Sequence, residues 1–101
     1  MCFQGENNMT AEEIFDIADL FKMFADATRV KILLALFEGE KNVGEITEAV
    51  GATQTAVSHQ LRALKHGHLV KCRREGKNMY YTLADDHVKI IINCAVEHVE
   101  E

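Results

Sequence analysis

The stretch TQTAVSHQLRALKHGHLVKCRREGKNMYYTL, residues 53–83, contains a predicted helix followed by a predicted β-hairpin. Thr53 can cap the helix and Gly67 can end it. The apolar side chains between them recur at helical spacing and should face inward: Val57, Leu61 and Leu64. Two segments with the composition of strands follow, residues 69–74 and 79–83, with the turn EGKN between them.

Three further helix starts are predicted upstream of this stretch. Residues 10–13 fit a capping box, and apolar side chains then recur at helical spacing at Ile14, Ile17, Phe21 and Phe24. Asp26 can cap a second helix that stops at Gly39, with a predicted apolar stripe of Val30, Leu33, Leu34 and Phe37. A short third helix should start at residues 42–45 and end at Gly51, with Ile46, Ala49 and Val50 on its apolar side. The third and fourth helices have the spacing of a helix-turn-helix.

A fifth helix is predicted to start near Asp85, so the expected order is α-α-α-α-β-β-α. This order is that of a winged helix-turn-helix, a mainly α fold in which the hairpin forms the wing. The 101 residues are enough for one domain and not for two. We expect residues 1–9 to be disordered, and residues 10–25 and 85–101 to form dimerisation helices.

The charge is distributed unevenly, although the net charge is −5. Residues 1–26 carry six acidic residues and one lysine, and residues 85–101 carry five acidic residues and one lysine. Residues 53–78 instead carry six basic residues and one glutamate. A basic segment in an acidic chain indicates a local contact with an anionic partner such as nucleic acid.

The remaining composition indicates a cytoplasmic protein without a membrane span. No apolar run approaches membrane-spanning length, and the opening residues MCFQGENNMT do not resemble a signal peptide. The three cysteines are Cys2, Cys72 and Cys94; an odd number without a CxxC pair argues against a disulfide framework and suits a reducing compartment.

The fourth helix has a polar face in its N-terminal half, which is the part that enters a major groove in helix-turn-helix docking. Gln54 can pair with adenine edges, while Thr55 and Ser58 can contact bases or phosphates. The face comprises Gln54, Thr55, Ser58, His59 and Arg62. An ordinary solvated helix face is the alternative, and His59 can instead pack against the turn.

The hairpin tip carries three basic residues, which we interpret as phosphate contacts of the wing: Arg73, Arg74 and Lys77. A basic turn can also serve solubility alone, so the cluster is the signal rather than any one residue. Double-stranded DNA is the predicted partner.

The final helix has metal-binding side chains at both ends of an apolar middle. Asp85 and His87 lie at one end, and His98 and Glu101 lie at the other. The two histidines share a helix face but lie about 16 Å apart along the axis, so one helix cannot bring both to one ion. Two antiparallel copies can do so, giving two sites with two oxygen and two nitrogen ligands each, a set that suits tetrahedral zinc.

Other roles for these residues remain open. Asp85 can act as a helix N-cap, and His98 and Glu101 can form a solvated tail. The apolar middle is predicted to be the seam between the two copies; its residues are Ile90, Ile91, Cys94 and Ala95.

Three segments together resemble the ArsR/SmtB family of metal-sensing repressors: ADATRVKILLALFEGE, VGEITEAVG and the stretch at residues 53–83. The resemblance covers about residues 12–101, and TAVSHQLRAL is its most specific part. It implies that the polar residues of the fourth helix contact DNA. It also implies zinc binding by Asp85, His87, His98 and Glu101, because the zinc-sensing subgroup has similar residues at these relative positions.

The resulting hypothesis is a homodimeric repressor that releases operator DNA when zinc, or cobalt or nickel at the same residues, binds between the last helices. A thiol- or persulfide-responsive repressor that uses Cys94 is an alternative, although no partner cysteine is evident. A zinc hydrolase is a weaker alternative, because it needs an open coordination position and a nearby general base. We therefore predict that the protein is not an enzyme.

Overall fold

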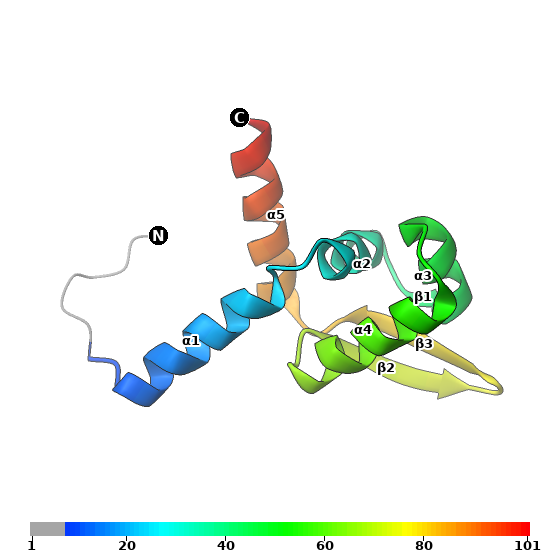
Figure 1. The fold of residues 1–101 in the computed structure, drawn as a ribbon, viewed down its shortest axis with the longest axis horizontal. Coiled ribbons are helices and arrows are strands. Elements are labelled where there is room, and N and C mark those ends of the chain that lie inside the picture. Colours follow the sequence, from blue (N-terminus) through cyan, green and yellow to red (C-terminus); the bar gives the residue numbers. More distant parts are fainter. Residues whose placement is uncertain (1–7) are drawn as a thin grey trace.

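The structure is a computed structural model that describes residues 8–101. The predicted helices and hairpin are confirmed, and one strand is added (Figure 1). The expectation for residues 1–9 falls mostly on residues 1–7, which lie outside the described residues, as does Cys2. In chain order the elements are α1 (Ala11–Met23), α2 (Ala27–Phe37), β1 (Lys41–Asn42), α3 (Val43–Val50), α4 (Gln54–His66), β2 (Val70–Glu75), β3 (Asn78–Leu83) and α5 (Asp86–Glu100).

Side-chain caps fix the start of every helix, at the positions that the sequence predicts. Thr10 and Glu13 form the capping box of α1, and Asn42 and Glu45 form that of α3. The remaining helices each begin with a side-chain oxygen that accepts a backbone N–H of the first turn, from Asp26 in α2, Thr53 in α4 and Asp85 in α5. Each cap satisfies a backbone donor that the helix itself leaves unpaired.

The turn between α3 and α4 depends on a glycine. Gly51 has φ +78°, in the left-handed region, and it ends α3 by donating its N–H to the carbonyl of Thr47. A side chain on residue 51 would strain this conformation. Two residues later Thr53 caps α4, so the turn is as short as predicted.

The sheet has three antiparallel strands in the order β1-β3-β2, so the expected two-stranded hairpin was incomplete. Strand β1 pairs Lys41 with Tyr81 and Asn42 with Tyr80. It was missed because two residues are too few for an alternating pattern to appear in the sequence. Since α3 begins at Val43, directly after β1, this pairing joins the wing to the helix-turn-helix.

The core lies between α2, α3, α4, the sheet and the first half of α5. Its largest fully buried side chains are Ile32, Leu33, Leu36, Ile46, Leu61, Leu64, Leu69 and Val57. The predicted stripe of α2 was wrong in part, because Leu34 and Phe37 are more than a third exposed and Ile32 and Leu36 are buried. Helix α2 is apolar at every position from 32 to 37, so periodicity alone does not show which side faces the core.

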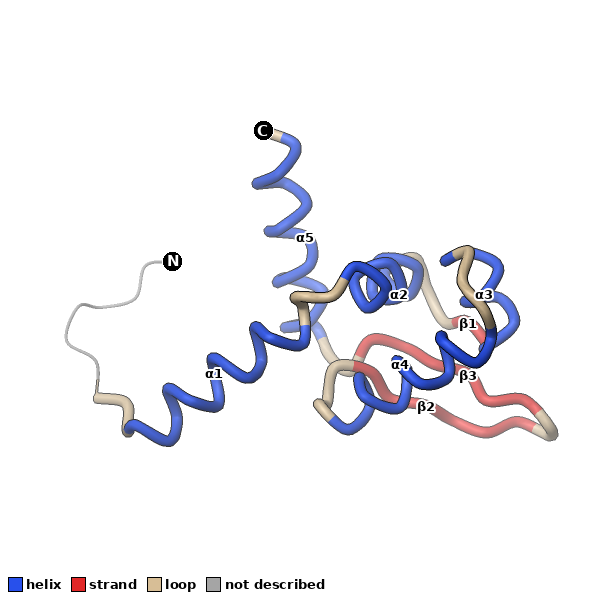
Figure 2. The backbone as a smooth tube through the Cα atoms, viewed as in Figure 1, coloured by secondary structure: helices blue, strands red, loops and turns tan. Residues whose placement is uncertain are grey.

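The helices α1 and α5 project from this body, as Figure 2 shows. Helix α1 has no buried residue, and α5 buries only Val88 and Ile92. Large apolar side chains are exposed on both helices: Ile14, Phe15, Ile17 and Phe21 on α1, and Ile90 and Val99 on α5. Within residues 8–101, none of the helices has the length and apolar character needed to cross a membrane.

Candidate DNA-binding surface and metal-binding residues

The structure brings together all five polar residues predicted on α4. They line one shallow hollow of about 430 Å³ on the surface of the molecule, formed by Gln54, Thr55, Ser58, His59 and Arg62. Val57, Leu61 and Leu64 are fully buried on the other side of the same helix, which holds the polar face outward. His59 is exposed and lines the hollow, so it does not pack into the turn. The arrangement presents donors and acceptors on a helix face that none of residues 8–101 buries.

A second face of α4 is tied to the start of α2. The Nε of Arg29 donates to the Oε1 of Gln60 at 2.7 Å, and a terminal guanidinium nitrogen of Arg29 lies 3.6 Å from the Sδ of Met23. Met23 also packs against the end of α4, because a Cβ added at Gly67 would lie 3.0 Å from its Cε. These contacts fix the position of α4 relative to the end of α1 and the start of α2.

The wing extends the exposed surface beyond α4. Lys77 at the hairpin tip and Gln54 at the start of α4 line a second hollow of about 410 Å³, which also includes the start of α3. Arg74 is exposed, and its Nε donates to the carbonyl of Gly76 at 3.2 Å. Two of the three predicted wing cations, Arg74 and Lys77, therefore make no ion pair among the described contacts.

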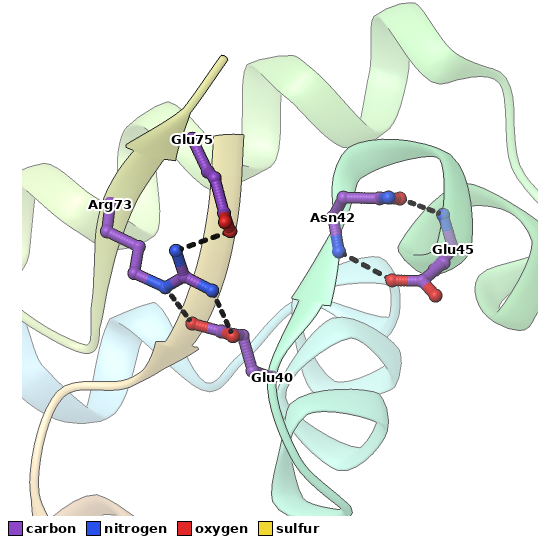
Figure 3. A network of polar contacts seen from close by, with 5 residues as sticks. All are labelled: Glu40, Asn42, Glu45, Arg73 and Glu75. Carbon is purple, nitrogen blue, oxygen red and sulfur yellow. Dashed lines mark hydrogen bonds and ion pairs between the residues drawn. The ribbon is translucent and has the colours of Figure 1, made fainter. Parts of the chain in front are cut away.

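Arg73, the third predicted wing cation, is bound to two carboxylates (Figure 3). Its Nε and Nη2 donate to the two oxygens of Glu40 at 2.8 and 2.9 Å, and its Nη1 donates to Glu75 at 2.9 Å. The hydrogen bonds from Arg73 lower the pKa of Glu40 below its ordinary value, and the two carboxylates raise the pKa of Arg73. Arg73 is thus in a different environment from Arg74 and Lys77.

Tyr81 is in β3, the central strand of the sheet, and pairs in register with Cys72 of β2 and Lys41 of β1. Burial raises the pKa of the Tyr81 phenol above its ordinary value, and the nearby Cys72 adds to this shift. The neutral phenol and the half-buried thiol fit a packing role for Cys72 in the hairpin, rather than a metal-binding one.

The predicted metal ligands lie in two pairs at opposite ends of α5. At its start, the Nδ1 of His87 lies 3.8 Å from the Oδ1 of Asp85, and both side chains are mostly exposed. The same Asp85 oxygen accepts the N–H of Val88 at 3.1 Å, so this carboxylate caps the helix and faces His87. His98 lies in the last turn and Glu101 directly follows the helix; both are exposed.

The donor set fits a divalent metal only if a second chain completes it. No group of three or more histidine, cysteine, aspartate or glutamate side chains converges anywhere in residues 8–101. Each end of α5 nevertheless offers one imidazole and one carboxylate, which are ligands that zinc accepts. Four ligands therefore require a pair from one chain and a pair from another.

Comparison with known proteins supports the interpretation of the fold. The sequence profile described as "Bacterial regulatory protein, arsR family" matches residues 26–71. A transcriptional repressor SmtB homolog from Synechocystis sp. is 38% identical over 93 residues, which are 92% of this chain and 70% of that protein. The chain belongs to the ArsR family of bacterial regulatory proteins.

The similarity extends over nearly the whole chain, in sequence with one further relative and in structure with another. A cadmium resistance transcriptional regulatory protein CadC homolog from Staphylococcus aureus is 36% identical over 97% of this chain and 82% of its own length. The homodimeric winged helix-turn-helix DNA-binding domain of Mb0332 from Mycobacterium bovis has a TM-score of 0.85 and 33% identity, covering 98% of this chain and 92% of that one. The first of these relatives is named as a transcriptional regulatory protein, and the second as the DNA-binding domain of a possible ArsR-family transcriptional regulator.

Two side-chain pairs that shape this surface were not predicted from the sequence, Glu40 with Arg73 and Arg29 with Gln60. Glu40 and Arg73 are 33 residues apart, and Arg29 and Gln60 are 31 residues apart. Pairs at such separation leave no periodic signal in a single sequence. The capping acids could be found because their partners lie three residues away.

Proposed function

We propose that this protein is a transcriptional repressor that binds operator DNA as a homodimer and releases it when zinc binds between the C-terminal helices. The observation that supports DNA binding best is the exposed face of α4, where five polar side chains line one hollow above a fully buried apolar face. Gln54, Thr55 and Ser58 are the residues that we assign to base and phosphate contacts, with His59 and Arg62 beside them. Arg74 and Lys77 add contacts from the wing.

The exposed apolar surface of α1 and α5 supports the homodimer. Phe15 and Val99 are 71% and 80% exposed, and such side chains on two projecting helices favour burial against a second copy. An apolar hollow of about 460 Å³ lies between α2 and α5; it is lined by Phe24, Val30, Leu34, Ile92, Ala95, Val96, Val99 and Glu100. We assign residues 10–25 and 85–101 to dimerisation and the whole chain to one DNA-binding domain in the cytoplasm.

The two half-sets of ligands on α5 support zinc as the regulatory ligand. We assign Asp85 and His87 of one chain, with His98 and Glu101 of the other, to each of two symmetric sites. The cadmium resistance relative is consistent with a response to a divalent metal ion. Cobalt or nickel can use the same residues with added ligands.

The thiol-responsive alternative has less support. Cys72 is in β2 and Cys94 is in α5, and both are free thiols in the described part of the chain. Cys94 is exposed on the helix that we assign to dimerisation, where a small, weakly polar side chain packs well.

The experiment that tests the proposed function measures DNA affinity with and without zinc. A duplex is selected from a random pool with the wild-type protein in the presence of a chelator, and its Kd is measured by fluorescence anisotropy. Zinc should raise this Kd by about 5- to 150-fold, the usual range of coupling between two sites. His87→Asn should bind the same duplex but lose the response to zinc.

His68→Asn serves as the matched control. His68 is exposed and has φ +64°, a conformation that asparagine also adopts, so this change removes a histidine without disturbing the backbone. The variant should keep the wild-type response. A Kd that does not depend on zinc, or an equal loss of response in both variants, would contradict regulation at α5.

A further inference from the structure

A three-residue ion-pair network, Glu40–Arg73–Glu75, connects the wing to the segment before β1 (Figure 3). Arg73 uses three of its donor nitrogens, two on Glu40 and one on Glu75. Its guanidinium also lies over the ring of Tyr80, 4.8 Å from the centroid. A fork of this kind with two parallel hydrogen bonds to one carboxylate fixes direction as well as distance.

The network spans the whole sheet. Arg73 is on β2 and pairs in register with Tyr80 on β3, which in turn pairs with Asn42 on β1. Glu40 precedes β1, so the Arg73 side chain reaches across β3 to the segment that leads into the helix-turn-helix. Strand β1 contributes only two residues, and the hairpin beyond it consists of two strands alone. A two-stranded hairpin is weakly held by itself, so the network adds a lateral tie at this point.

The charges of the network do not suit a direct phosphate contact. One guanidinium faces two carboxylates, which gives the cluster a net charge of −1. The hydrogen bonds from Arg73 hold the pKa of Glu40 below its ordinary value, so this carboxylate is ionised at neutral pH. Arg74 and Lys77 have no such partner among the described ion pairs, and they lie farther along the hairpin toward its tip.

We propose that Glu40 and Arg73 are positioning residues for DNA binding: together they hold the wing at the angle at which Lys77 reaches the DNA backbone while α4 occupies the groove. This inference rests on the proposed DNA-binding function and assigns Arg73 a role different from that of its basic neighbours. Glu40, an acidic residue, then strengthens the binding of a polyanion.

The sign of the effect at Glu40 distinguishes this role from general electrostatics. Removal of an exposed acidic side chain from a DNA-binding protein raises its affinity or leaves it unchanged, because repulsion falls. Glu40→Gln should instead lower the affinity for DNA. The matched control is Glu38→Gln, which removes an acidic side chain from the same loop. The Glu38 side chain is exposed and forms a single longer ion pair, 3.7 Å, with the partly buried Lys41.

The test measures the Kd of the selected duplex at several KCl concentrations for wild type, Glu40→Gln, Glu38→Gln, Arg73→Lys and Lys77→Ala. Glu40→Gln and Arg73→Lys should both reduce affinity several-fold and reduce the salt slope by about 0.9, the value for one lost phosphate contact. Arg73→Lys keeps the charge but cannot form the paired hydrogen bonds to Glu40, so a direct phosphate contact would survive this change. Glu38→Gln should bind at least as tightly as wild type.

The double variant Glu40→Gln/Lys77→Ala gives the sharpest readout. If Glu40 acts by placing the wing and Lys77 makes its main contact, substitution of Glu40 should have a much smaller effect once Lys77 is gone. A Glu40→Gln variant that binds like Glu38→Gln, or an effect that adds fully to that of Lys77→Ala, would overturn the positioning role. A wild-type protein without salt-dependent DNA binding would overturn both this role and the proposed function. Thermal unfolding of each variant checks that the fold is retained.

Discussion

The body of the molecule and its two projecting helices differ in how their apolar side chains are satisfied. In the body, α2, α3, α4 and the sheet bury their apolar side chains against one another, and Val57 and Leu61 of α4 are fully buried. In α1 and α5, side chains of the same types remain in solvent, with Phe21 59% and Ile90 57% exposed. Both regions have well-capped helices, so local helix formation does not account for the difference.

The difference shows which part of the fold is complete within one chain. The body closes its core with two residues from the first half of α5, Val88 and Ile92, and exposes the polar face of α4 in a single copy. The projecting helices have an apolar surface that only further burial stabilises, and this surface lies beside the predicted metal ligands. We therefore propose that the body recognises DNA and that the projecting helices regulate this binding.

The largest expected effect is on metal binding by the projecting helices. His87→Ala and His98→Ala homodimers should each lose both zinc sites, because every site takes one histidine from each chain. A mixed dimer of the two variants should regain one site. The His87→Ala chain still supplies His98, and the His98→Ala chain still supplies His87. One site therefore has both histidines and the other has neither.

The mixed dimer is purified through a different affinity tag on each chain, and zinc is titrated against a colorimetric chelator. The expected stoichiometry is one zinc per mixed dimer and none for either variant homodimer. Both homodimers should still bind DNA, because α4 is unchanged. A folded mixed dimer that binds no zinc would refute ligands shared between antiparallel helices.

The second prediction compares an apolar residue from each region. Leu61→Ala should lower the free energy of unfolding by about 2–5 kcal/mol, because it leaves a cavity in the core. Phe21→Ser should leave the body intact and instead weaken the dimer, so that its stability depends more strongly on protein concentration.

Urea unfolding at two protein concentrations, with sedimentation as a second measurement, separates the two cases. The Leu61→Ala midpoint should be lower at both concentrations, whereas the Phe21→Ser protein should sediment as a monomer at the lower one. If Phe21→Ser remained a dimer at both, α1 would not belong to the interface.

The same division explains how much of the structure could be predicted from the sequence. Helix starts were predictable because the cap and its partner are three residues apart, as in Thr10 and Glu13. The polar face of α4 was predictable because Val57, Leu61 and Leu64 define the opposite face at helical spacing. Periodicity alone predicts that the apolar stripe of α1 is buried. Its exposure in one chain fits the assignment of α1 to dimerisation, which stays a prediction.

The parts that could not be predicted depend on contacts between distant segments. Strand β1 exists because Lys41 and Asn42 meet β3 some forty positions later, and the environment of Arg73 depends on Glu40. Leu34 and Leu36 are the same residue type, but Leu34 is partly exposed and Leu36 is buried. Only the packing of α2 against the rest of the body determines this difference. The metal-binding residues remain a prediction from spacing, because one chain contains only half of each proposed set.

The smallest expected effect concerns specificity within the body. Gln54→Ala should reduce discrimination between the selected duplex and a random one by about 1–3 kcal/mol, the value of a good base contact. Because Gln54 is exposed, the free energy of unfolding of the Gln54→Ala protein should change by no more than about 0.5 kcal/mol, in contrast to Leu61→Ala.

Arg62→Ala, from the same face, should weaken binding to both duplexes alike and reduce the salt slope by about 0.9. Anisotropy titrations of both variants on both duplexes make the distinction. Unchanged discrimination in Gln54→Ala, with tight binding retained, would mean that another face of α4 reads the bases.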